Sequence, residues 1–65
     1  MRITLNGAEK EIAATTVEAL VTELGFKRGM VLVEQNGTAL RPDEWAATGL
    51  GENDRVEVLR IVAGG

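Results

Sequence analysis

The two glycines that end the sequence are the residues whose chemistry is most distinctive. Gly64 and Gly65 follow an apolar stretch, and glycine has no Cβ, so a main-chain carboxylate here can enter a narrow channel. Such a carboxylate is ionised and unreactive toward nucleophiles at neutral pH. Adenylation with ATP would give it a leaving group that a sulfur nucleophile or an amine can displace. We therefore expect acyl transfer at the Gly65 carboxylate.

The side chains offer little chemistry of their own. The 65 residues include no cysteine, histidine, tyrosine or serine, which removes most nucleophiles and most groups that move protons near neutral pH. The carboxylates lack metal-ligand spacing, and the glycines do not form a phosphate-binding loop. We therefore expect a chain that is not an enzyme and binds no metal or cofactor, with ATP bound by a partner enzyme.

The charge and the hydropathy of the chain exclude two kinds of partner. Seven lysines and arginines stand against ten aspartates and glutamates, a net charge of −3, which does not suit a phosphate backbone or an anionic membrane. The sequence begins directly with a strand-like pattern and has no apolar stretch of membrane-spanning length. We expect a cytoplasmic protein that is monomeric when free, with neither nucleic acid nor membrane as a partner.

The elements that must position the terminus start with a β-hairpin. Ile3 and Leu5 alternate with polar residues, Asn6-Gly7 favours a type I′ turn, and residues 8–13 form a second extended stretch. The hairpin is the first predicted element.

A helix is predicted next, from an apolar stripe with helical spacing. The stripe consists of Val17, Leu20, Val21 and Leu24. Thr15, which has capping-box spacing to Glu18, and Thr16 are both candidate N-caps, while Gly25 followed by Phe26 suits a left-handed C-terminal cap. Residues 27–29 then form a short exposed connection.

A second hairpin follows the helix. Residues 30–35 form an apolar strand, and Asn36-Gly37 forms a turn. Residues 38–40 form a short return strand, which Pro42 ends.

The last third of the chain leads to the terminal strand. Residues 41–45 form a turn or one helical turn that packs Trp45 against the core, because a single tryptophan in a small domain is more often a packing group than a ligand-stacking group. Residues 46–54 form a loop, anchored by Leu50 and with Asn53 suited to a left-handed conformation. The final strand covers residues 55–62.

This order of elements predicts an α+β fold in one domain over residues 1–65, with residues 63–65 as a flexible tail. One helix packs on one face of a mixed sheet of four or five strands, and the first and last strands are parallel neighbours. This is the β-grasp arrangement. A ferredoxin-like fold would need a second helix.

Both faces of the central strands are apolar. We assign Val31, Val33, Val56 and Val58 to the core. We assign Met30, Leu32, Leu59 and Ile61 to an exposed patch that binds partner proteins. The alternatives are that loops cover this second face, or that the two faces are exchanged.

Several motifs together resemble the ubiquitin-like β-grasp sulfur carriers, and most closely the ThiS family of thiamine biosynthesis, which is related to the small subunit of molybdopterin synthase. The resemblance covers the whole chain. Its marks include the two Asn-Gly turns, the Arg41-Pro42-Asp43-Glu44-Trp45 segment, the entry to the last strand at residues 54–58, and the terminal glycines. The spacing from Pro42 to Trp45 together with the terminal glycines is the most specific combination. Asn53 stands where the family usually has glycine.

The resemblance implies a function for the terminus. An E1-like adenylyltransferase would adenylate the Gly65 carboxylate, a sulfur-donating enzyme would supply sulfur to give a thiocarboxylate, and thiazole synthase would receive that sulfur. Only Gly64 and Gly65 match functional residues of the family. The alternatives are a sulfur carrier for molybdopterin or another pathway, and a ubiquitin-like protein modifier, because one fold serves all three.

Overall fold

The computed structural model describes residues 1–62, which begin with a β-hairpin. Strands β1 (Arg2–Leu5) and β2 (Ala8–Glu11) are antiparallel. Asn6 and Gly7 have φ of 50° and 84°, the two positive values of a type I′ turn, as predicted. The second strand is shorter than the predicted 8–13, because β1 begins at Arg2, which lies opposite Glu11.

Helix α1 (Val17–Glu23) begins at Thr16. The Ala19 N–H donates to Thr16 Oγ1 at 3.1 Å, which satisfies one of the free N–H groups of the first turn. Thr16 is therefore the N-cap, and the alternative cap, Thr15, is wrong.

The end of α1 is a left-handed glycine cap, as predicted. Gly25 has φ of 86° and its N–H donates to the Thr22 carbonyl at 3.0 Å, while the Phe26 N–H donates to the Val21 carbonyl at 3.1 Å. These two bonds define a Schellman motif, which satisfies carbonyls of the last turn.

The second hairpin consists of β3 (Val31–Gln35) and β4 (Thr38–Leu40), preceded by a 3₁₀ turn, η1 (Arg28–Met30). The prediction that Met30 opens the strand is wrong, because its N–H donates to the Lys27 carbonyl at 3.0 Å and closes the turn instead.

A longer 3₁₀ segment, η2 (Pro42–Ala47), follows and buries Trp45, which is 1% exposed. The loop after it contains Asn53, whose φ of 68° is left-handed as predicted. Strand β5 (Arg55–Arg60) completes the sheet. It ends two residues before the predicted residue 62, because its pairing with β3 ends at Val31 opposite Arg60.

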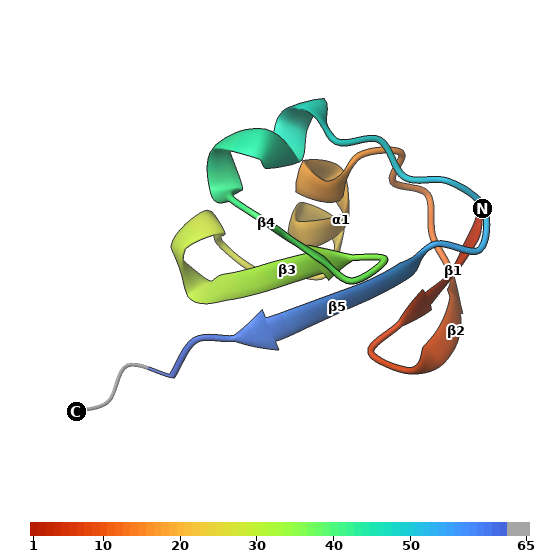
Figure 1. Cartoon of the computed structure of the whole chain (residues 1–65), viewed down its shortest axis with the longest axis horizontal. Helices are drawn as coiled ribbons and strands as arrows, with labels where there is room; N and C mark the ends of the chain where they lie inside the picture. Colours follow the sequence, from red (N-terminus) through yellow and green to blue (C-terminus); the bar gives the residue numbers. More distant parts are fainter. Residues whose placement is uncertain (63–65) are drawn as a thin grey trace.

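The strands lie in the order β2-β1-β5-β3-β4. The pairing of β1 with β5 is parallel, and all other pairings are antiparallel. The last strand is therefore the centre of the sheet, and the predicted mixed β-grasp sheet is confirmed with five strands in the described residues (Figure 1).

The core lies between the sheet and the side that carries α1 and η2 (Figure 1). It consists of Ile3, Ile12, Ala14, Val17, Leu20, Val21, Val31, Val33, Trp45, Val56 and Val58. The predicted burial of the four core valines is confirmed. None of the helices within residues 1–62 is long and apolar enough to cross a membrane.

Candidate functional site

An exposed apolar patch lies on the side of the sheet opposite α1. Leu32 on β3 lies directly across from Leu59 on β5, and the Ile61 N–H donates to the Met30 carbonyl at 2.8 Å. The two paired strands and the residues next to their ends thus bring four residues into one group, Met30, Leu32, Leu59 and Ile61, which we call the β3–β5 patch.

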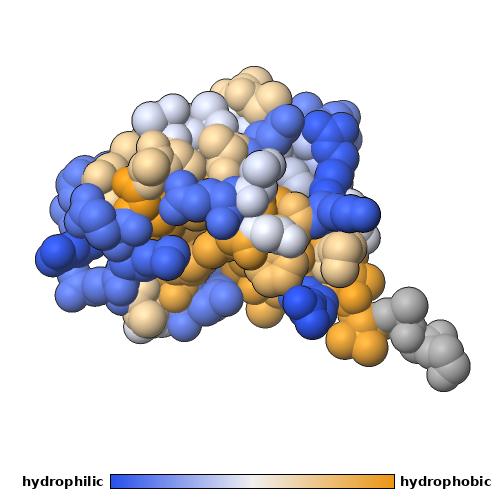
Figure 2. Space-filling model, turned by 180° about the vertical axis from the view of Figure 1, so that it is seen from behind, coloured by the Kyte–Doolittle hydropathy of each residue, from blue (hydrophilic) through white to orange (hydrophobic). Residues whose placement is uncertain are grey.

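The patch is open to solvent. Its four side chains are 42% to 57% exposed, and Val62 beyond it is 82% exposed. Viewed from behind, the surface where the described chain ends is also hydrophobic (Figure 2). The predicted exposure of these residues is confirmed and the faces are not exchanged, whereas binding of a partner there stays a prediction.

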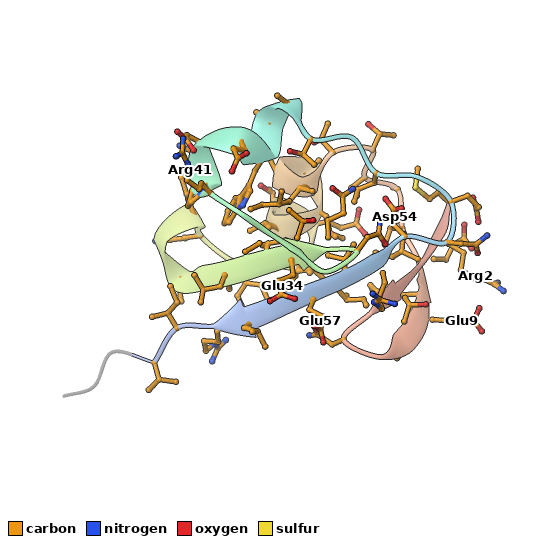
Figure 3. The ribbon with its side chains drawn as sticks, in the orientation of Figure 1. Arg2, Glu9, Glu34, Arg41, Asp54 and Glu57 are labelled. Atoms are coloured by element: carbon orange, nitrogen blue, oxygen red, sulfur yellow. The ribbon has the colours of Figure 1, made fainter. Side chains whose placement is uncertain are left out.

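Two glutamates border the patch. Glu34 and Glu57 lie directly opposite each other on β3 and β5 (Figure 3). Neither takes part in an ion pair among residues 1–62. Like charges facing each other across a sheet are destabilising, so this pair weakens the free domain. Sequence analysis missed the pair because it depends on the register between two strands.

Arg60 marks the end of β5. Its guanidinium carbon lies 5.4 Å from the centre of the Phe26 ring, a cation–π geometry that places the arginine on the helix side of the sheet. The patch residues Leu59 and Ile61 project to the other side, because successive side chains of a strand alternate. Arg60 therefore does not cover the β3–β5 patch.

A polar network fixes the start of β5. Asp54 Oδ2 accepts hydrogen bonds from the Gly51 N–H at 2.7 Å and from Gln35 Nε2 at 3.0 Å, and Asp54 Oδ1 accepts one from Asn36 Nδ2 at 3.0 Å. Burial alone would raise the pKa of Asp54, but these donors outweigh it and lower the pKa below its ordinary value. The carboxylate is therefore a structural anchor for the strand that carries the patch.

The predicted reactive residues, Gly64 and Gly65, lie outside the described residues. Val62 is the last residue that the structure places, and β5 leads toward it from the centre of the sheet (Figure 1). Their role in acyl transfer stays a prediction.

Residues 1–62 contain no group of three or more side chains that could hold a metal ion. An open depression of about 470 Å³ lies beside α1. Its lining consists of Thr16, Glu18, Ala19, Thr22, Glu23 and Ala46. Acidic side chains without a cation do not suit nucleotide phosphates, and ATP binding by a partner stays a prediction.

The topology and the apolar face beside the last strand define a β-grasp domain of the ubiquitin-like class. A model of the ThiS family matches residues 3–65, nearly the whole chain. The chain therefore belongs to the ThiS family.

Solved structures agree with this assignment. The crystal structure of a thiamine biosynthesis protein (ThiS) from Geobacter metallireducens superposes with a TM-score of 0.83 at 30% identity, and each chain is fully covered. The solution structure of a thiamine biosynthesis protein from the same organism gives a TM-score of 0.82 at 30% identity, covering all of this chain and 88% of the other. The fold predicted from the element order is thus that of known relatives.

Two curated relatives are much longer proteins. The thiazole synthase of Paramagnetospirillum magneticum is 33% identical over 66 residues, and that of Magnetococcus marinus is 38% identical over 66 residues. In both cases the whole of this chain is matched, but it spans only 20% of the relative's length. These thiazole synthases thus contain a region similar to this chain.

Proposed function

We propose that the chain is a sulfur carrier of thiamine biosynthesis that serves as the substrate of its partner enzymes and is not itself an enzyme. The observation that carries the proposal is the family match over residues 3–65, which includes both terminal glycines. The names of the relatives favour thiamine over other sulfur pathways, because both long relatives are thiazole synthases.

The chemistry takes place at the main-chain carboxylate of Gly65. A carboxylate oxygen attacks the α-phosphorus of ATP on an E1-like adenylyltransferase, and pyrophosphate leaves. A sulfur nucleophile, in net terms hydrosulfide, then attacks the carbonyl carbon and AMP leaves. The terminal carbon keeps one oxygen and gains one sulfur, which makes it a thiocarboxylate. Thiazole synthase accepts this sulfur in the proposed pathway.

The partner enzymes supply the catalytic groups. The chain contributes a slender terminus, since neither Gly64 nor Gly65 has a side chain that would obstruct a narrow active site. It also contributes the β3–β5 patch, where exposed apolar side chains on a rigid sheet give a partner a surface to bury. Regions similar to this chain within thiazole synthases support direct contact with that enzyme.

The intact mass of the protein tests the proposal. The chain is incubated with the adenylyltransferase of its own organism, ATP and a sulfide source, and we expect a gain equal to the replacement of one oxygen by sulfur. Deletion of Gly65 should abolish this gain and leave the melting temperature unchanged. An unchanged mass, or lysine-linked conjugates only, would overturn the proposal, as would a natural protein that continues beyond Gly65.

A further inference from the structure

The two Asn-Gly turns hold β5 through the same kind of contact. Asn6 and Asn36 both have φ of 50°. Asn36 Oδ1 accepts a hydrogen bond from the Arg55 N–H at 2.8 Å, and Asn6 Oδ1 accepts one from the Val58 N–H at 2.8 Å. The main-chain N–H of Asn36 also donates to the Arg55 carbonyl at 2.7 Å, and that of Asn6 donates to the Val56 carbonyl at 2.9 Å. Each turn thus fixes β5 through its asparagine.

The side-chain amide nitrogens of the two asparagines have different partners. Asn6 Nδ2 donates to the Val58 carbonyl at 3.2 Å, in a contact that is partly buried. Asn36 Nδ2 donates to Asp54 Oδ1 at 3.0 Å, and this contact is exposed. A carboxylate in place of the Asn36 amide would therefore face the Asp54 carboxylate, and two like charges at this distance repel each other. The same change at Asn6 would place a carboxylate beside a neutral carbonyl.

Asparagine followed by glycine is the pair in which this change is chemically easiest. The main-chain nitrogen of the glycine attacks the side-chain Cγ of the asparagine, and its proton leaves with the side-chain NH2 as ammonia. Water then opens the resulting succinimide to aspartate or isoaspartate. Glycine does not hinder the attack, because it has no Cβ. Even an added Cβ at Gly7 or Gly37 would meet no described atom within 4 Å, so solvent reaches both turns.

We propose that Asn36 is a site of spontaneous deamidation and that its conversion to a carboxylate releases the start of β5. Cyclisation requires the Asn36 amide to leave Arg55 and Asp54. These contacts are exposed, and they belong to a hairpin whose outer strand, β4, has three residues and lies at an edge of the sheet. Such a turn opens more often than the Asn6 turn, whose side-chain contacts are partly buried and whose strand β1 is paired on both sides.

The product would disturb the polar network that fixes the start of β5. Asp54 accepts hydrogen bonds from Gly51, Gln35 and Asn36, and a carboxylate at position 36 removes one of these donors and adds repulsion. Isoaspartate also adds a carbon to the main chain of a two-residue turn, on which the β3–β4 register depends. This modification does not depend on the proposed function.

Ageing of the unaltered chain compares the two sites under identical conditions. The folded chain is incubated at mildly alkaline pH, and peptide mass mapping measures aspartate and isoaspartate at Asn6 and Asn36. Each rate is divided by the rate of the same site in urea, which removes the effect of the neighbouring sequence. We expect the normalised rate at Asn36 to be at least about tenfold higher than at Asn6. Equal normalised rates, or a faster reaction at Asn6, would overturn the assignment of the site.

Two matched substitutions test the release of β5. Asn36→Asp and Asn6→Asp make the same chemical change, and aspartate tolerates a left-handed conformation at both turns. We expect Asn36→Asp to lower the melting temperature at neutral pH by at least about 5 °C more than Asn6→Asp does. Adding Asp54→Asn to Asn36→Asp exchanges the donor and the acceptor, and it should restore most of this difference. Equal melting temperatures of the two single variants, or a double variant that is not restored, would overturn the release.

Discussion

At the scale of single residues, Asp54 shows how one carboxylate orders the strand that carries the patch. Its three donors come from the loop before β5, from the last residue of β3 and from the β3–β4 turn, and they favour the charged form. The pKa of Asp54 in the folded protein is below its ordinary value. This stabilisation is therefore fully present at pH values above the ordinary pKa of the group. It is lost as the pH falls from that value through the lower folded pKa.

Asp54→Ala should therefore lower the free energy of unfolding by about 1–2 kcal/mol at neutral pH, a value reduced for the partial exposure of the site. The difference from the unaltered protein should shrink in acid, below the folded pKa. Urea unfolding at both pH values measures it. Asp43→Ala is the control, because Asp43 only meets Arg41 in an exposed pair, and it should change stability by less than about 0.5 kcal/mol. Equal effects of the two substitutions would contradict the role of Asp54.

At the scale of elements, the two threonines before α1 are chemically alike but differ in geometry. Only Thr16 accepts a hydrogen bond from the first turn through its side chain, whereas Thr15 uses its main-chain carbonyl, which accepts from the Leu50 N–H at 2.9 Å. Thr16→Ala should destabilise the protein by about 1 kcal/mol. Thr15→Ala keeps its carbonyl and should stay within about 0.5 kcal/mol of the unaltered protein. Thermal unfolding compares them, and the reverse order would show that the cap is assigned to the wrong residue.

Local sequence patterns predicted the elements that depend on residues close together in the sequence. The Asn6-Gly7 and Asn36-Gly37 turns and the Gly25 cap follow from residues that tolerate positive φ, and α1 follows from its apolar spacing. The choice between Thr15 and Thr16 depends on contacts distant in sequence, because the Leu50 N–H donates to the Thr15 carbonyl and the Val17 N–H donates to the Thr48 carbonyl. The place of Met30 in a 3₁₀ turn was missed because its apolar side chain also fits the strand pattern of residues 31–35.

Only part of the candidate site could likewise be predicted from local sequence patterns. Parity along each strand was enough to separate Val31 and Val33 from Leu32, because burial alternates with a period of two. The facing Glu34–Glu57 pair could not be predicted, since it requires the register of β5 against β3.

At the scale of the whole molecule, the sheet has one buried face and one face whose apolar residues are exposed. Val58 and Leu59 are adjacent in sequence, yet Val58 is 6% exposed and Leu59 is 51% exposed. Val58→Thr should cost about 1–3 kcal/mol, because it buries a hydroxyl. Leu59→Thr should change stability by less than about 1 kcal/mol, because threonine suits an exposed strand. It should nevertheless lower kcat/KM for adenylation of the chain about tenfold.

Denaturant unfolding and steady-state adenylation assays separate the two effects. A Leu59→Thr protein that is adenylated as efficiently as the unaltered chain would show that the β3–β5 patch is not a binding face. Loss of stability equal to that of Val58→Thr would show that the face is covered.

The central position of β5 also bears on how the chain folds. Because the first strand and the third both pair with the last, residues 1–50 lack the middle of the sheet, and neither hairpin can join the other until Arg55 and the residues after it are present. Such distant pairings slow folding, because a long loop must close before any contact offsets its entropy. During synthesis, the core therefore closes only after the segment that leads to the two glycines has been made, so a truncated chain would be recognisable to proteases as unfolded.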